Sequence, residues 1–157
     1  MSIKYFDMFA GIGGFRSGLE AIGGFECVGY CEIKYAKQAY EAIYDTGGEL
    51  YFDDARKIVP DFDLITGGFP CQSFSIAGAR KGFDDTRGTL FFEIARIVAV
   101  KKPKYLFLEN VPGLLNHDSG KTFETILRTG SPKSYKLFGE RRHSIADELL
   151  TACGRNE

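Results

Sequence analysis

Short apolar runs alternate along this chain with longer segments whose apolar residues recur every three or four positions. The runs have the length of buried strands, and the longer segments have the length of amphipathic helices. The predicted strands cover residues 3–8, 25–31, 63–66 and 105–108. The predicted helices cover residues 15–22, 34–44, 89–101, 121–128 and 145–152, with a short irregular or helical piece at 54–58. Strands separated by helices predict an α/β fold with a doubly wound, mostly parallel sheet.

The segments between these elements predict a turn at 45–48 and loops at 67–88 and 112–119. A loop as long as 67–88 is more often a binding loop or lid than a connector, and simple disorder is the alternative. From residue 130 the alternation of strands and helices stops, so we expect an incomplete sheet. The predicted organisation is a domain over residues 1–129 and a tail over residues 130–157.

Length and composition are those of one globular domain with a single core: 157 residues, 44% hydrophobic, with a net charge of −1. No apolar run reaches the ~18 residues that span a bilayer, and no signal segment opens the chain. We therefore expect a cytoplasmic protein with no membrane contact. The four cysteines, Cys27, Cys31, Cys71 and Cys153, lack a paired spacing, so we expect free thiols and no metal site.

The charges nearly cancel but are unevenly distributed. Residues 1–70 hold 6 basic and 11 acidic side chains, residues 71–104 hold 7 and 3, and residues 105–157 hold 7 of each. The basic excess in the middle segment is either an ordinary solvated surface or one that follows the phosphates of a nucleic acid. It consists of Arg80, Lys81, Arg87, Arg96, Lys101, Lys102 and Lys104.

A glycine-rich turn joins the first predicted strand to the first helix, in the run Asp-Met-Phe-Ala-Gly-Ile-Gly-Gly from Asp7 to Gly14. Glycines there let backbone N–H groups approach a ligand at the start of a helix. Glu32 ends the second strand, where an acid can accept hydrogen bonds from a ribose diol. The pattern predicts a nucleotide crevice suited to NAD, FAD or S-adenosylmethionine, and a turn used only for packing is the alternative. Asp53 and Asp54 are either a further contact, such as to an adenine amino group, or surface acids.

Two more predicted strands end near side chains that can take part in a reaction. Cys71 follows one strand on a tight turn, in the run Gly-Gly-Phe-Pro-Cys-Gln-Ser, and Glu109 ends the other. Reacting groups gather at such strand ends in open α/β sheets, so we expect the sulfur of Cys71 and the carboxyl of Glu109 to lie side by side. A thiolate adds to an electron-poor carbon such as C6 of cytosine, and an acid that protonates the ring nitrogen favours this addition. Glu109 fits that role if its apolar neighbours enclose it and raise its pKa.

Covalent addition at C6 makes C5 nucleophilic enough to take a methyl group from a sulfonium donor. The alternatives at these two positions are an inert buried thiol at Cys71 and an acid at Glu109 that caps the following turn.

Four segments resemble the DNA (cytosine-5)-methyltransferase family in order and spacing. They are Phe9–Phe15, Gly68–Ser75, Lys81–Phe91 and Glu109–Val111, with Pro-Cys-Gln and Glu-Asn-Val the most specific motifs. The resemblance implies a Rossmann-like S-adenosylmethionine-dependent methyltransferase fold. It also implies methyl transfer from S-adenosylmethionine to C5 of cytosine in double-stranded DNA, with the target cytosine flipped out of the duplex.

The resemblance further implies roles for individual residues. Cys71 is the nucleophile that forms the covalent adduct, and Glu109 is the acid that protonates the ring. The residues placed around S-adenosylmethionine are Asp7, Phe9, Gly11, Gly13, Gly14, Glu32, Ile33, Asp54 and Pro70. The candidate DNA contacts, in a mobile catalytic loop over 67–88, are Gln72, Ser73, Ser75 and Arg87.

The chain also departs from the family pattern. The run after the second strand is one acid short, and the Gln-x-Arg-x-Arg motif and the target-recognition region are absent. Ser134–Gly139 resembles the start of the family's last motif, but Glu140 and Arg141 stand where Asn-Ser is usual. The prediction is therefore a fragment or one subunit of a restriction–modification methyltransferase, whose complementary subunit supplies target recognition. A non-catalytic S-adenosylmethionine- or DNA-binding remnant is the second hypothesis. A nicotinamide-dependent oxidoreductase is the third, and it leaves Cys71 and Glu109 unexplained.

Overall fold

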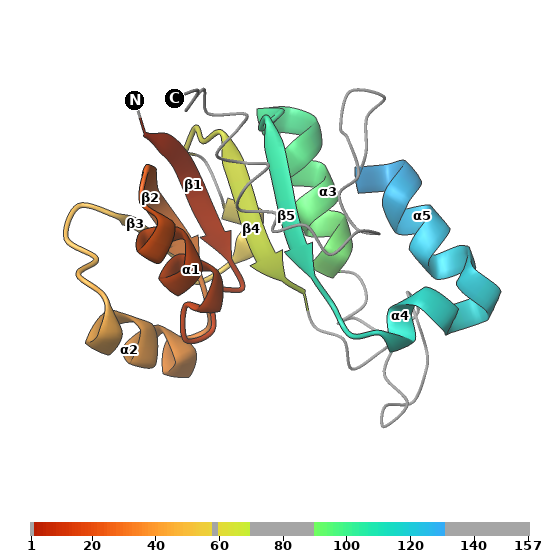
Figure 1. The fold of residues 1–157 in the computed structure, drawn as a ribbon, viewed down its shortest axis with the longest axis horizontal. Coiled ribbons are helices and arrows are strands. Elements are labelled where there is room, and N and C mark those ends of the chain that lie inside the picture. Colours follow the sequence, from red (N-terminus) through yellow and green to blue (C-terminus); the bar gives the residue numbers. More distant parts are fainter. Residues whose placement is uncertain (1, 58–59, 70–89, 131–157) are drawn as a thin grey trace.

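The computed structural model describes residues 2–57, 60–69 and 90–130 (Figure 1). The strands in these ranges are β1 (Ile3–Met8), β2 (Phe25–Cys31), β3 (Leu50–Phe52), β4 (Leu64–Gly68) and β5 (Tyr105–Glu109). The α-helices are α1 (Gly14–Ile22), α2 (Lys34–Ile43), α3 (Leu90–Lys101), α4 (Gly113–Asn116) and α5 (Lys121–Gly130), and the 3₁₀ helices are η1 (Ala55–Lys57) and η3 (His117–Gly120).

The strands form one parallel sheet in the order β3-β2-β1-β4-β5. The chain builds the sheet outward from β1 to β3 and then continues on the other side of β1 with β4 and β5. The order of the strands therefore reverses between β1 and β4. In such sheets the crevice outside the carboxyl ends of the strands at this reversal is where ligands bind. The arrowheads of β1, β4 and β5 mark that edge in Figure 1.

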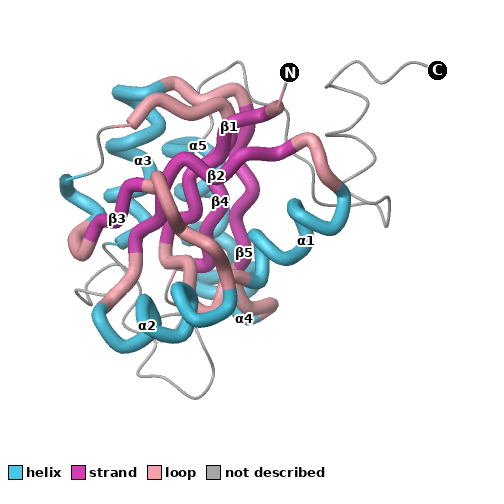
Figure 2. Tube along the Cα trace, turned by 90° about the vertical axis from the view of Figure 1, so that its left-hand side faces the viewer, coloured by secondary structure: helices cyan, strands magenta, loops and turns pink. Residues whose placement is uncertain are grey.

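Apolar side chains cover both faces of the sheet. Tyr5 and Leu64 pack with Leu19 of α1 on one face. Phe6 and Ile65 pack on the other face, against α3. Figure 2 shows α1 and α3 on opposite sides of the sheet. Because both faces are covered, residues 5–8 of β1 and residues 64–67 of β4 are all buried, as expected for central parallel strands. The predicted doubly wound α/β fold is confirmed.

Three short elements were not predicted: β3, α4 and η3. β3 lies where the sequence showed no strand, and it has three residues that pair with Gly29–Cys31 of β2. The loop predicted over 112–119 was wrong, because α4 and η3 occupy it. Leu114 of α4 is buried in the same core cluster as α3, so packing favours a helix in a segment whose composition is that of a loop.

The remaining predictions for the long segments lie outside the described residues. They concern the loop from Pro70 to residue 88, the helix at 145–152 and the tail that begins after residue 130. Within the ranges that the structure describes, no helix is long and apolar enough to cross a bilayer.

Candidate active site at the carboxyl ends of the strands

The glycine-rich turn leaves β1 with an unusual backbone. Phe9, Gly11 and Gly13 all have positive φ, of 56°, 56° and 82°. Glycine adopts this left-handed region without strain, whereas Phe9 does so at a cost of ~1 kcal/mol or more. Backbone strain of this kind is concentrated at functional sites, because the surrounding structure must hold it in place. Gly14 then begins α1, so the turn delivers its N–H groups to the start of a helix.

Glu32 ties this turn to the next strand. One oxygen of its carboxylate accepts the N–H of Gly11 at 2.7 Å, and the other accepts the N–H of Ile33 at 2.6 Å. A carboxylate offers about four lone-pair sites, so two acceptor sites are left for the hydroxyls of a ligand. The side chains of Ile12 and Ile33, 68% and 65% exposed, leave apolar surface beside the turn and beside Glu32.

Asp7 lies beneath the turn with no solvent exposure. The hydroxyl of Thr66 donates to one carboxylate oxygen at 2.8 Å, and the hydroxyl of Tyr40 donates to the other at 3.3 Å. Burial raises the pKa of Asp7 to about 7, against the opposing effects of these two hydrogen bonds and of the Arg16 charge. Asp7 is therefore enclosed behind the turn, with its carboxylate held by Thr66 and Tyr40, and its predicted contact with the cofactor stays a prediction.

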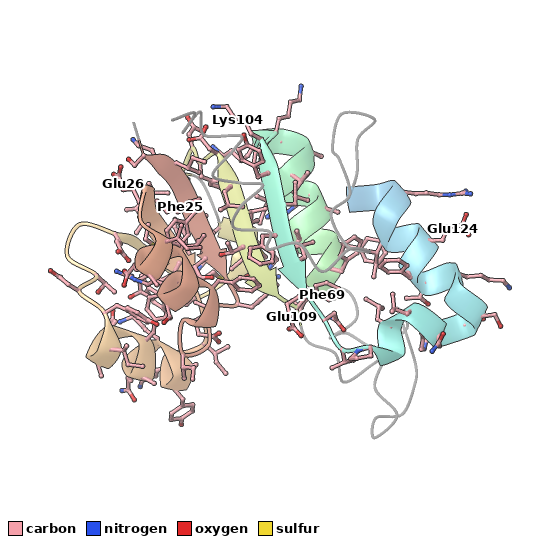
Figure 3. The ribbon with its side chains drawn as sticks, viewed as in Figure 1. Phe25, Glu26, Phe69, Lys104, Glu109 and Glu124 are labelled. Carbon is pink, nitrogen blue, oxygen red and sulfur yellow. The ribbon has the colours of Figure 1, made fainter. Side chains whose placement is uncertain are left out.

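The carboxyl ends of β4 and β5 lie side by side. Gly68 pairs with Glu109, and a Cβ added to Gly68 would lie 3.1 Å from Oε2 of Glu109. The side-chain amide of Asn110 donates to the carbonyl of Phe69 at 2.9 Å, while its oxygen accepts the N–H of Val111 at 2.9 Å. Figure 3 shows Phe69 and Glu109 together at this end of the sheet, away from Lys104 at the other end of β5. The chain is thus fixed beside Glu109 two residues before Cys71.

Six of the predicted site residues lie outside the described part of the chain. They are Pro70, Cys71, Gln72, Ser73, Ser75 and Arg87. The approach of the Cys71 sulfur to the Glu109 carboxyl therefore stays a prediction.

The enclosure expected for Glu109 was wrong: its side chain is exposed. Glu109 is the last residue of β5. The other side chains of this strand pack into clusters on the two faces of the sheet, with Leu106 and Leu108 on the α3 face and Phe107 on the α1 face. Glu109 lies beyond both clusters, at the carboxyl edge of the sheet opposite Gly68.

Asp53 and Asp54 follow β3, next to the end of β2. Asp54 accepts three contacts from the guanidinium of Arg56, which holds its pKa at about 2, and Asp53 pairs with Lys57 at 3.1 Å. Both carboxylates are therefore engaged by basic neighbours on the same short segment. A contact with adenine and a surface role both stay predictions for these acids.

The basic residues that the structure describes between 90 and 104 favour the ordinary solvated surface. Arg96 pairs with Glu93 at 2.8 Å, and Lys101 pairs with Asp61 at 2.9 Å. Lys104 pairs with an acid near the start of β4, at the amino end of the sheet and opposite the crevice. Arg96, Lys101 and Lys104 are thus each paired with an acid, and Lys102 is exposed. Arg80, Lys81 and Arg87 lie outside the described residues.

Neither described cysteine has the character of a nucleophile. Burial raises the pKa of Cys27 to about 12, and it raises the pKa of Cys31 to the same value with help from nearby carboxylates. Such thiols are almost entirely protonated at neutral pH and therefore unreactive. In the ranges covered by the structure, no three His, Cys, Asp or Glu side chains are grouped as metal ligands would be.

Sequence reasoning missed the side chains that support the site from behind. Arg16 and Tyr40 are buried under the turn, and the partly buried ring of Tyr44 packs against them. Thr66 donates to Asp7, and Asn110 donates to the carbonyl of Phe69. The only signal in the sequence was the apolar face of the helix at 34–44, which includes Tyr40. Nothing in the pattern indicated what these side chains contact.

A model of the C-5 cytosine-specific DNA methylase family matches residues 3–140 of the chain. The chain belongs to this family. It is 47% identical to the type II methyltransferase M.HhaI of Haemophilus parahaemolyticus over 164 aligned residues, which cover 99% of this chain and 50% of that protein. It is 46% identical to the orphan methyltransferase M.SPRI of Bacillus phage SPR, with 86% of this chain and 32% of that protein covered.

Among solved structures, this cytosine methylase family member resembles the Dnmt2 methyltransferase of S. pombe with a TM-score of 0.58 at 19% identity. The match covers 82% of this chain and 40% of that one, and it shows the shared fold. The family and the Rossmann-like fold expected from the sequence are both confirmed. The chain spans half or less of the length of these relatives.

Proposed function

We propose that this chain binds S-adenosylmethionine at the carboxyl ends of β1 and β2 and methylates C5 of cytosine in DNA through a covalent adduct with Cys71. The observation that carries the proposal is the junction of β4 and β5. Gly68 faces Glu109, and Asn110 holds the carbonyl of Phe69. The acid and the start of the segment that contains Cys71 thus leave the sheet together.

The cofactor role of the turn is supported by donors and acceptors of the right kind. In this proposal Glu32 accepts hydrogen bonds from the ribose hydroxyls, Ile33 contacts the adenine ring, and the N–H groups between Phe9 and Gly14 face the amino-acid end. Asp54 and Pro70 complete the site. When bound, S-adenosylmethionine supplies a methyl group on a positively charged sulfur.

The chemistry at cytosine uses the residues at the ends of β4 and β5. The thiolate of Cys71 forms a bond to C6 while Glu109 gives a proton to N3, and the ring electrons move to C5. C5 then takes the methyl group. Glu109 takes back the N3 proton, water takes the proton from C5, and expulsion of the Cys71 thiolate restores the ring. An exposed Glu109 is compatible with this role, because the acid must reach a base that enters the crevice from solvent.

We further propose that recognition of a DNA sequence comes from a complementary subunit or from a remainder of a longer chain. The relatives are two to three times longer than the matched region. Gln72, Ser73, Ser75 and Arg87 would contact the DNA near the target, which alone gives weak, salt-sensitive binding with little sequence preference. In this proposal the DNA sequence is read by groups outside residues 1–157.

The test is covalent trapping on duplex DNA that contains 5-fluorocytosine, with S-adenosylmethionine present. Fluorine at C5 cannot leave as a proton does, so the adduct persists and appears as a shifted band. The wild-type chain should form this band, Cys71→Ser should not, and Glu109→Gln should form it more slowly. Cofactor binding without a band, even after addition of a matching recognition subunit, would show a non-catalytic remnant instead.

A further inference from the structure

We propose that Tyr44 is a positioning residue that holds the glycine-rich turn in the shape that the cofactor requires. This inference rests on the proposed binding of S-adenosylmethionine and deepens it. Tyr44 follows α2 and lies 31 positions after Gly13 in the sequence, yet its hydroxyl donates to the carbonyl of Gly13 at 2.8 Å.

The ring of Tyr44 also occupies the space where any side chain at position 13 would lie. A Cβ on Gly13 would be 2.2 Å from Cε2 of Tyr44 and 2.8 Å from its hydroxyl oxygen, far inside van der Waals contact. Gly13 has φ 82° and ψ 38°, and its carbonyl also accepts the N–H of Ser17 in the first turn of α1. The tyrosine thus fixes the residue at which the turn becomes the helix.

A buried cation holds Tyr44 in this position. The guanidinium of Arg16 lies 4.6 Å from the centre of the Tyr44 ring and 5.3 Å from that of Tyr40. Arg16 is itself fixed by Glu49 at 2.8 Å and by the carbonyl of Asp45 at 2.9 Å. These contacts join the segment after α2 to the first turn of α1, and the Tyr44 ring packs between Arg16 and the ring of Tyr40, 5.0 Å away.

The two ends of α2 therefore hold the same turn. At the start of the helix, Glu32 accepts the N–H groups of Gly11 and Ile33. After its end, Tyr44 binds Gly13. A turn with three left-handed residues has many conformations available when it is free, and ordering it on binding costs conformational entropy. Fixing the turn in advance removes this cost, so Tyr44 raises affinity without touching the cofactor.

The experiment compares three variants by calorimetric binding of S-adenosylhomocysteine. Tyr44→Phe keeps the ring and removes the hydrogen bond, and Tyr44→Leu also opens the space beside Gly13. The control is Tyr35→Phe, a tyrosine of α2 that is 81% exposed. We expect the Kd to rise about three- to tenfold for Tyr44→Phe, further for Tyr44→Leu, and not at all for the control.

A second measurement needs no ligand. Hydrogen exchange of the amides between Gly11 and Ser17 should be several-fold faster in Tyr44→Phe than in wild type, with exchange in β4 unchanged. A Tyr44→Phe variant that melts lower but binds with the wild-type Kd would show a role in stability alone and overturn the inference. If the wild-type chain itself does not bind, the proposed cofactor function fails first. Should Tyr44→Leu not fold, Tyr44→Phe still decides the question.

Discussion

Arg16 offers a sharp test of how burial sets the strength of an ion pair. Its guanidinium pairs with Glu20 at 2.7 Å and with Glu49 at 2.8 Å, so the two distances are nearly equal. The side chain of Arg16 is 5% exposed. Its partner Glu20 is 48% exposed, whereas its partner Glu49 is only 10% exposed. Similar geometry in two different environments predicts two different energies.

The expected magnitudes follow from that difference. Glu20→Gln removes a solvent-exposed pair between adjacent helical turns and should cost ~0.5 kcal/mol or less. Glu49→Gln removes a charged hydrogen bond from a buried site and should cost ~1.5–3 kcal/mol. Arg16→Met leaves the Glu49 carboxylate buried without its cation and should cost ~3–5 kcal/mol. The double variant, Arg16→Met with Glu49→Gln, should cost less than the two single variants added together, by at least ~1 kcal/mol.

Urea denaturation at neutral pH measures all four free energies of unfolding, with the slope of the transition checked for constancy. Equal costs for Glu20→Gln and Glu49→Gln would contradict the argument from burial. Strictly additive effects of Arg16→Met and Glu49→Gln would contradict it as well, because they would mean that the two side chains do not stabilise each other.

Three further predictions concern the site itself. Gly68→Ala places a Cβ 3.1 Å from the exposed Glu109 carboxylate, which must move by a few tenths of an ångström. The rate of trapping on 5-fluorocytosine DNA should fall several-fold, while the free energy of unfolding stays within ~0.5 kcal/mol of wild type. Equal trapping rates for the variant and wild type would refute this prediction. Glu32→Gln sets an amide N–H₂ against the N–H of Gly11 or Ile33, so the Kd for S-adenosylhomocysteine should rise about tenfold in calorimetry, and an unchanged Kd would remove Glu32 from the site. Burial raises the pKa of Asp7 from 3.8 to about 7, so between these two pH values the folded state holds a proton that the unfolded chain has lost. The free energy of unfolding should therefore fall as the pH rises from about 4 to about 7, by at most ~1.4 kcal/mol per pH unit. Urea melts across this range should show the fall in wild type relative to Asp7→Asn, and a flat difference would count against a protonated Asp7.

Local patterns in the sequence located most of the elements. β1 and β2 have the predicted bounds, and α1, α2, α3 and α5 differ from the prediction by one or two residues at their ends. Apolar periodicity reports whether a position is buried, which is enough to find long elements. It failed for β3, whose three residues gain their hydrogen bonds from β2, and for α4, which forms where Leu114 enters the core.

Part of the candidate site could likewise be predicted from the sequence, and part could not. The turn after β1, Glu32 after β2 and Glu109 after β5 could be found from the sequence, because the end of a strand is a local feature. The enclosure expected for Glu109 could not be judged, since it depends on how far the flanking helices extend beyond the last residue of the strand.

The sequence by itself therefore determined the parallel α/β fold, the family and the residue types at the strand ends. Only the tertiary structure decided the register that places Gly68 opposite Glu109, and the contact of Tyr44 with Gly13 beside a buried Arg16. The physical reason is that a repeat of two or 3.6 residues specifies which side of an element faces the core. The partner that it meets there depends on the order of the strands and on the packing of helices far apart in the chain.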